Sequence, residues 1–150
     1  MIGFVTDLLV VNVLDPQALE ERGETRAYVD VEGLPVDADP QELDLLPLST
    51  TIRSREIGGS IELRHTIDVG LDVQHGDAGE ARRLRDAIVL ELVLRHLDAR
   101  DAYAQAVDPV SAAYVIESGF TIDYRPLAVG DTDTNASATI SFVFDTALDR

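Results

Sequence analysis

Two stretches of alternating apolar and polar residues stand on either side of Gly58-Gly59. The first begins at Leu46. The second runs to Val73, and its apolar residues occupy odd positions: Ile61, Leu63, Ile67, Val69, Leu71 and Val73. Alternation of this kind predicts strands with one buried and one wet face, and paired glycines predict a tight turn. The pattern therefore predicts a long β-hairpin in the middle of the chain.

The apolar spacing becomes helical beyond Gly76, which is expected to end the second strand. Asp77, with Glu80 three residues later, predicts a capping box and a helix that runs to about Leu97. We expect this helix to pack across the odd face of the hairpin. Its predicted apolar face comprises Ala81, Leu84, Ala87, Ile88, Leu92 and Leu94. Its predicted polar face comprises Arg82, Arg83, Arg85, Asp86 and Arg95.

The residues before the hairpin are less regular. Residues 1–14 are strongly apolar, and their spacing fits a helix as well as a strand, so the pattern does not decide between them. Further elements are expected before the hairpin: a short helix over 15–22 opened by Asp15-Pro16 and ended by Gly23, a strand over 26–31, and a loop over 33–42 with a second cap at Asp39-Pro40.

The last third of the chain predicts strands separated by polar turns. The expected elements are a turn at Asp108-Pro109, short strands at Tyr114–Ile116 and Phe120–Tyr124 around Ser118-Gly119, a polar loop over 125–135, and a final strand at Ala136–Phe144 with Ala138, Ile140, Phe142 and Phe144 on one face. Residues 1–150 are therefore predicted to form one α+β domain, in which an antiparallel or mixed sheet with a long β-hairpin is packed by one main helix, plus a short amino-terminal helix.

The charge balance is strongly acidic, with 28 Asp and Glu residues against 12 basic ones and a formal net charge of −16. All the basic residues are arginines, and Asp outnumbers Glu by 18 to 10. A surface of short carboxylates without lysine stays hydrated in abundant salt, and molar salt shortens the Debye length to about 3 Å, which screens self-repulsion. We interpret the composition as that of a salt-adapted organism. A generic acidic sequence of high-GC origin is the alternative.

The composition also excludes several classes of function. There is no basic surface for nucleic acid or for anionic membranes. There is no cysteine, so disulfides, thiolate zinc sites and cysteine nucleophiles are excluded. Asp7 interrupts the amino-terminal apolar run and no basic residues precede it, so no signal peptide is expected. No apolar stretch approaches 18 residues, so no membrane span is expected.

Three histidines are the first candidates for chemistry. His65 occupies an odd position of its strand, so its ring is expected among apolar residues, where it must find a partner or shift its pKa. His75 lies at the junction of strand and helix, and His96 lies near the helix carboxyl end, where a cation suits the macrodipole. They lack the i, i+4 spacing of a helical zinc site, and we expect each to be structural.

Carboxylates are so numerous that few of them are informative. Asp68 and Asp72 share the wet face of one strand and could bind a cation or act as acid and base, but a solvated face also accounts for them. The segment from Asp131 to Asn135 resembles half of a calcium loop. It lacks the sixth-position Gly and twelfth-position Glu of an EF-hand, where Ala136 and Phe142 stand.

No nucleophile elbow and no glycine-rich phosphate loop is present. We therefore assign no catalytic, cofactor-binding or metal-ligating residue, expect no cofactor, and expect the chain not to be an enzyme. The predicted second strand of the hairpin has about fourteen residues, against a usual five or six. Strands longer than their own core requires often pair between subunits, which favours assembly over a merely twisted sheet.

The order of elements from about Leu46 onward resembles that of the tail-terminator, or tail-completion, proteins of long-tailed phages. The resemblance rests on the hairpin LLPLSTTIRSREIGGSIELRHTIDVGLDVQ, the acid-capped helix DAGEARRLRDAIVLELVLRHL, and the closing pair YVIESGFTIDYRPLAV and ASATISFVF. It covers about two thirds of the chain. The first 45 residues depart from it, because Asp15-Pro16 interrupts the expected amino-terminal helix.

The resemblance implies a structural virion protein that forms a homo-oligomeric ring, hexameric in that family, at the head-proximal end of the tail tube. Such a ring contacts the tail tube protein and the head-tail connector or stopper, and DNA passes through its lumen without specific binding. Together with the composition, it implies a tailed virus of a haloarchaeon, assembled in the host cytoplasm. The alternatives are another neck protein, such as a stopper or adaptor, and a small halophilic ligand-binding or enzymatic α+β domain.

Overall fold

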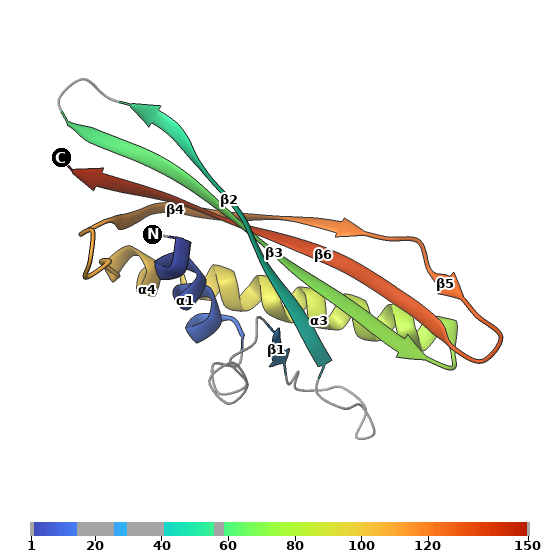
Figure 1. Ribbon diagram of the computed structural model, residues 1–150. Helices are drawn as coiled ribbons and strands as arrows, with labels where there is room; N and C mark the ends of the chain where they lie inside the picture. Colours follow the sequence, from blue (N-terminus) through green and yellow to red (C-terminus); the bar gives the residue numbers. More distant parts are fainter. Residues whose placement is uncertain (1, 15–25, 30–40, 56–58, 150) are drawn as a thin grey trace.

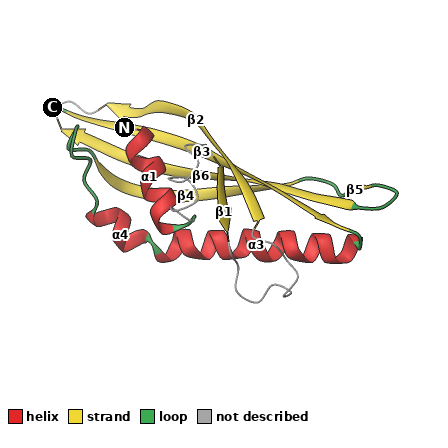
Figure 2. Ribbon diagram, turned by 60° about the horizontal axis from the view of Figure 1, so that its bottom comes forward, coloured by secondary structure: helices red, strands yellow, loops and turns green. Residues whose placement is uncertain are grey.

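The computed structural model describes residues 2–14, 26–29, 41–55 and 59–149, and it has the predicted α+β fold (Figure 1). Its helices lie against one face of a single sheet, and no described element covers the other face (Figure 2). The elements are α1 (Ile2–Asn12), β1 (Arg26–Val29), β2 (Gln41–Arg55), β3 (Ser60–His75), α3 (Ala78–Asp98), α4 (Arg100–Gln105), β4 (Tyr114–Tyr124), β5 (Ala128–Val129) and β6 (Thr134–Asp149).

All strand pairs in the sheet are antiparallel, and the strand order is β1-β2-β3-β6-β4, with β5 pairing the start of β6. β2, β3 and β6 have 15 or 16 residues, about three times the usual strand length. β3 and β6 come from distant parts of the sequence and pair from Ser60 opposite Asp149 to His75 opposite Thr134. Of the antiparallel and mixed sheets that the sequence allowed, the antiparallel one forms.

The hairpin of β2 and β3 is confirmed, and the buried odd positions of β3 are confirmed from His65 to Val73. Ile61 and Leu63 at the start of the strand are only half-buried. The reason is length, because a sixteen-residue strand spans about 53 Å and the 21-residue helix α3 only about 31 Å. α3 follows β3 directly, so it covers the later part of the strand and falls short of its beginning.

Asp77 caps α3 as predicted, since its Oδ1 accepts a hydrogen bond of 2.9 Å from the backbone N–H of Glu80. The predicted capping box is only half formed. The carboxylate of Glu80 binds Arg83 at 2.6 Å instead of reaching back. The N–H of Asp77 donates to Nδ1 of His75 at 2.9 Å. His75 therefore acts as the second acceptor at this helix start.

The buried face of α3 differs from the prediction at several positions, most clearly at Arg85 and Leu94. Arg85, predicted to be on the polar face, is 6% exposed. Its guanidinium lies over the ring of Tyr124 and donates to the carbonyl of Arg125 and the carboxylate of Asp86. Leu94, predicted to be apolar and buried, is 45% exposed. The buried residues are Ala81, Leu84, Arg85, Ile88, Val89, Leu92, Val93 and His96.

The core lies between α3 and the β3–β6 pair, so the expectation that α3 spans the hairpin is correct only for β3. Phe142 and Phe144 of β6 are fully buried beneath the helix, on the face that the alternation predicted. Within residues 1–14, which the pattern left open, Ile2–Asn12 form helix α1. Val5 and Leu9 of this helix, and Val13 just after it, are fully buried and extend the core on the same face of the sheet.

The strand expected at 26–31 is present as β1, and β2 begins at Gln41, five residues before the expected Leu46. The helix predicted at 15–22 lies outside the described residues, as does the cap predicted at Asp39-Pro40. The turn at Asp108-Pro109 forms as predicted. The carboxylate of Asp108 accepts from the N–H of Val110 at 3.0 Å and from the hydroxyl of Ser111 at 2.7 Å, which lowers the pKa of Asp108.

The two short strands predicted around Ser118-Gly119 are one continuous strand, β4. Ser118-Gly119 favours a turn, but pairing with β6 keeps this segment extended. The irregularity in β4 lies earlier in the strand, as a bulge between Val115 and Glu117. β6 extends the predicted final strand at both ends. The polar loop expected over 125–135 includes β5 and the first residues of β6.

We expect Ile88→Ala to lower the free energy of unfolding by about 2–4 kcal/mol, because Ile88 is fully buried against the sheet. Leu90, two residues further along α3, is 58% exposed, and Leu90→Ala is expected to cost less than about 1 kcal/mol. Denaturant unfolding of both variants at one fixed high salt concentration measures the difference. Equal losses would contradict the buried face of α3 described above.

Candidate functional site

His65 is fully buried on the helix-covered face of β3, as its odd position predicted. Its Nε2 lies 3.0 Å from the hydroxyl of Thr146 on the neighbouring strand. Burial lowers the pKa of His65, so the ring is neutral at neutral pH. Both predicted outcomes, a partner and a shifted pKa, therefore occur in a residue that packs in the core.

His96 is not the surface cation that its position near the end of α3 favoured. It is 1% exposed, and its ring packs edge-on against Phe142 and Phe144 at centroid distances of 4.8 and 5.4 Å. Burial lowers the pKa of His96 to about 4. The carbonyl of Gly119 can only accept, so Nε2 carries the proton and donates to it at 3.1 Å. Nδ1 then accepts from the hydroxyl of Tyr103 at 3.0 Å.

Asp68 and Asp72 lie on the open face of the sheet, as predicted, and each accepts a hydrogen bond from a serine of β6. The hydroxyl of Ser141 donates to Asp68 at 2.6 Å, and that of Ser137 donates to Asp72 at 3.1 Å. Gly70 lies between the two carboxylates on the same face. In the part of the chain that the structure describes, no three His, Cys, Asp or Glu residues come together to hold a metal ion.

The segment from Asp131 to Asn135 is a hairpin turn between β5 and β6 rather than a calcium loop. The N–H of Gly130 donates to the carbonyl of Asp133 at 2.8 Å and closes the turn. Asn135 already belongs to β6, where it pairs with Ala128 of β5. The spacing of oxygen-bearing residues here reflects turn formation, for which Asp and Asn are suited.

The open face also carries an ion pair that the sequence did not single out. The guanidinium of Arg64 on β3 donates two parallel hydrogen bonds of 2.9 and 3.1 Å to the carboxylate of Asp145 on β6. The Asp145 side chain is 4% exposed and that of Arg64 45%, so the arginine covers the carboxylate. Bidentate pairs of this kind fix orientation as well as charge. The contact ties the two central strands together on the side that no described helix covers.

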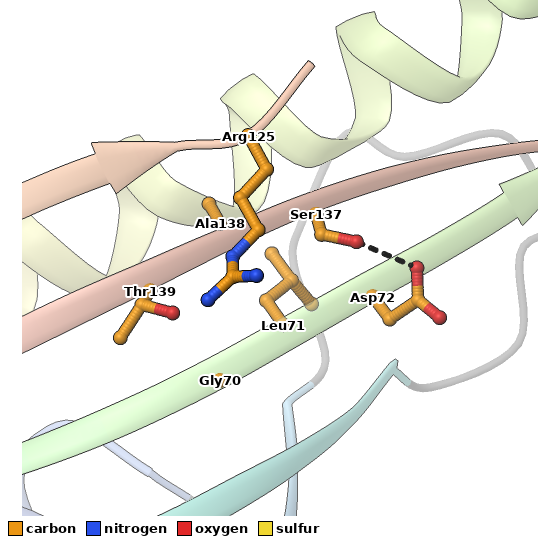
Figure 3. Close-up of a pocket in the computed structure, with 7 residues that line it drawn as sticks. All are labelled: Gly70, Leu71, Asp72, Arg125, Ser137, Ala138 and Thr139. Atoms are coloured by element: carbon orange, nitrogen blue, oxygen red, sulfur yellow. Dashed lines mark hydrogen bonds between the residues drawn. The ribbon is translucent and has the colours of Figure 1, made fainter. Parts of the chain in front are cut away.

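A shallow groove of about 460 Å³ lies further along the open face, and Figure 3 shows the residues around it. They come from β3, from β6 and from the segment just after β4, and comprise Gly70, Leu71, Asp72, Arg125, Ser137, Ala138 and Thr139. Sequence reasoning missed this groove. The only signal for it was a glycine on the wet face of a strand, and such a glycine more often marks a bulge or a bend.

Among the described residues, the sheet has unpaired edge stretches on both sides. β4 pairs with β6 on its inner side. On its outer side Tyr114 bridges to Val107, and no described strand pairs with residues 115–124. On the other side, β1 pairs only with residues 41–44 of β2, so residues 45–55 have no described neighbour on their outer side. An unpaired edge presents a row of backbone N–H and C=O groups that can pair with another chain.

No protein family, curated protein or solved structure matches the chain in comparisons of sequence and fold. None of the described helices combines the length and apolar character that a membrane crossing needs. The described histidines are committed to structural hydrogen bonds, and Asp68 and Asp72 to serine hydroxyls. The unpaired edge stretches and the open polar face are therefore the candidate functional features of the described surface.

We expect acid to weaken the fold through His96. Its folded pKa of about 4 lies below the ordinary 6.5, so the unfolded chain takes up the proton first as the pH falls. The stabilisation is complete above pH 6.5 and is lost as the pH approaches 4, by at most on the order of 3 kcal/mol. His96→Gln removes the titrating group, so its unfolding free energy does not fall with pH through this site. The unfolding free energies of the unmodified chain and of the variant should therefore lie closer together at pH 4.5 than at pH 7. A difference that stays constant would contradict a buried neutral His96.

Proposed function

We propose that the chain is a non-enzymatic structural subunit that joins head to tail into a closed ring, in which β4 of one copy pairs with β2 of the next. The observation that carries the proposal is a pair of edge stretches without a described partner strand, residues 45–55 of β2 and residues 115–124 of β4, on opposite sides of one sheet. Two different surfaces that bind each other repeat from copy to copy, and such a contact gives a ring when the rotation closes.

The strand directions support this contact. β2, β3, β6 and β4 alternate in direction, because every pair between them is antiparallel. With four alternating strands, β2 and β4 run in opposite directions. A second copy, rotated about an axis along the strands, therefore presents its β2 antiparallel to β4 of the first copy. The joined sheet would be antiparallel throughout, with no change of pattern at the junction.

Three irregularities limit the proposed pairing. Pro47 has no N–H to donate, and it stands at a register shift between β2 and β3, which is where proline is tolerated in a sheet. β2 has a second register shift between Ile52 and Ser54, and β4 has its bulge between Val115 and Glu117. The proposed contact therefore uses residues 49–55 of β2, with one irregularity inside this stretch, and the later part of β4.

We further propose that the ring is the tail terminator of a tailed virus, hexameric as in the family that the chain resembles. The order of elements supports this assignment: an amino-terminal helix, a strand, the long β2–β3 hairpin, an acid-capped helix and a closing strand pair. In this arrangement the open face lines the channel. Its carboxylates, among them Asp68, Asp72 and Asp123, would repel DNA phosphates and allow DNA to pass without binding.

The purified chain in molar salt should sediment as one closed oligomer of defined size, and as six copies if the family resemblance holds. Salt of this strength is required because it screens the net charge of −16 on each copy. Sedimentation velocity and native mass measurement give the copy number. A strict monomer at high concentration, with no ring when tail tubes are added, would rule out the proposed function.

Proline substitutions at Thr121 and Ile122 test the β4 edge directly. Neighbouring residues of an edge strand direct their N–H groups to opposite sides, so only one of the two faces outward. The variant with proline at the outward position should fold with helical and sheet content unchanged and remain monomeric. The other should lose stability through the β4–β6 ladder. A well-folded proline variant that still forms a ring of the original mass would contradict pairing through β4.

A further inference from the structure

Arg125 is the cation of the groove on the open face, and its backbone is held in place on both sides (Figure 3). Its N–H donates to the carbonyl of Ser137 at 3.1 Å, which continues the β4–β6 alignment by one residue. Its carbonyl accepts from the buried Arg85 at 3.2 Å. From this anchored position the side chain points across β6 toward Gly70 on β3.

The polar groups around the groove differ in whether they already have partners. The hydroxyl of Ser137 donates to Oδ1 of Asp72, so this hydroxyl proton is engaged, whereas the second oxygen of the carboxylate can still accept. Among the described residues, no carboxylate pairs with the guanidinium of Arg125 and no group bonds the hydroxyl of Thr139. Arg125 and Thr139 thus offer several donors at one place, and the carboxylate that lines the groove, Asp72, bonds Ser137 instead. The complementary ligand is a carboxylate, which accepts from an arginine fork and from a hydroxyl.

We propose that this groove receives a carboxylate side chain of the adjacent copy in the ring, held by Arg125 and Thr139. The inference rests on the proposed ring. It adds a charged anchor on the open face to the backbone pairing along β4. Such an anchor would fix the register of the two edges, which backbone hydrogen bonds alone specify weakly.

A second copy of this chain is the occupant that the charges favour. Acidic residues outnumber basic ones by 28 to 12, so any copy brings many more carboxylates than cations to a contact. Arg125 directly follows β4, the edge along which the next copy is proposed to run. An arginine left unpaired in the channel would attract DNA phosphates, and a carboxylate from the neighbouring copy removes that attraction.

Gly70 leaves room for the incoming group and also provides a control on folding. It is central in β3 and has a strand backbone without positive φ, so the backbone there is one that other residues adopt readily. A β-branched residue there suits a strand better than glycine does. Gly70→Thr should therefore keep or raise the melting temperature while its side chain partly fills the groove.

The test compares the concentration at which rings form for the unmodified chain and for three variants, measured by sedimentation velocity at one salt concentration. Arg125→Glu replaces the anchor by a repelling charge, and Gly70→Thr narrows the groove. Arg82→Glu makes the same charge change at an exposed position on α3, away from the open face. We expect the first two to raise the ring-forming concentration at least about tenfold with folding intact, and Arg82→Glu to leave it within about twofold.

Each outcome bears on one of the two proposals. If the unmodified chain forms rings and Arg125→Glu forms them equally well, the carboxylate anchor is wrong while the ring stands. If Arg125→Glu keeps the ring but loses attachment to tail tubes or changes retention of DNA, another partner occupies the groove and the second-copy assignment is wrong. If the unmodified chain forms no ring at all, the proposed function fails, and the anchor fails with it.

Discussion

The pairing of β3 with β6 is the interaction on which the rest of the structure depends. It joins residues 60–75 to residues 134–149 over sixteen antiparallel positions, and it gives both strands the same two faces. Apolar side chains from both strands line one face, and α3 packs on it. β2 pairs with β3 and β4 pairs with β6, so the same two faces continue across these outer strands. Without this long-range pair, α3 would have no surface to cover, because a single hairpin offers too little apolar area for a stable fold.

The core contains polar groups, and all of them are satisfied. His65, Arg85 and His96 are buried, and no buried polar side-chain atom among the described residues lacks a partner. His96 links α3, α4 and β4 through Tyr103 and Gly119, so one neutral ring fixes the relative position of three elements. Burial and hydrogen bonding, rather than proximity to charge, set its protonation, and the ring supports the packing.

The function proposed for this chain follows from the strand edges that have no described partner. The sheet leaves residues 45–55 of β2 and residues 115–124 of β4 without a described partner strand, and these two stretches run in opposite directions. The acidic composition is consistent with assembly in concentrated salt, because acidic copies that repel one another in dilute salt can approach when the charge is screened. The open face is polar and mostly self-satisfied, through Ser137 and Ser141 on the aspartates and through Arg64 on Asp145. Arg125 stands out against that background.

The sequence by itself determined the elements whose signals are local. Alternation along β3, the cap of α3 at Asp77, and the α+β class follow from periods and capping chemistry that act within a few residues. It did not determine that β4 is one strand, because Ser118-Gly119 resembles a turn until β6 lies beside it. It did not show that Arg85 and His96 are buried, because apolar and charged residues are mixed around α3. The groove at Arg125 also required three segments to meet. Tertiary structure decided these features because long-range pairing selects which side of each element faces the core, and with it which groups stay exposed.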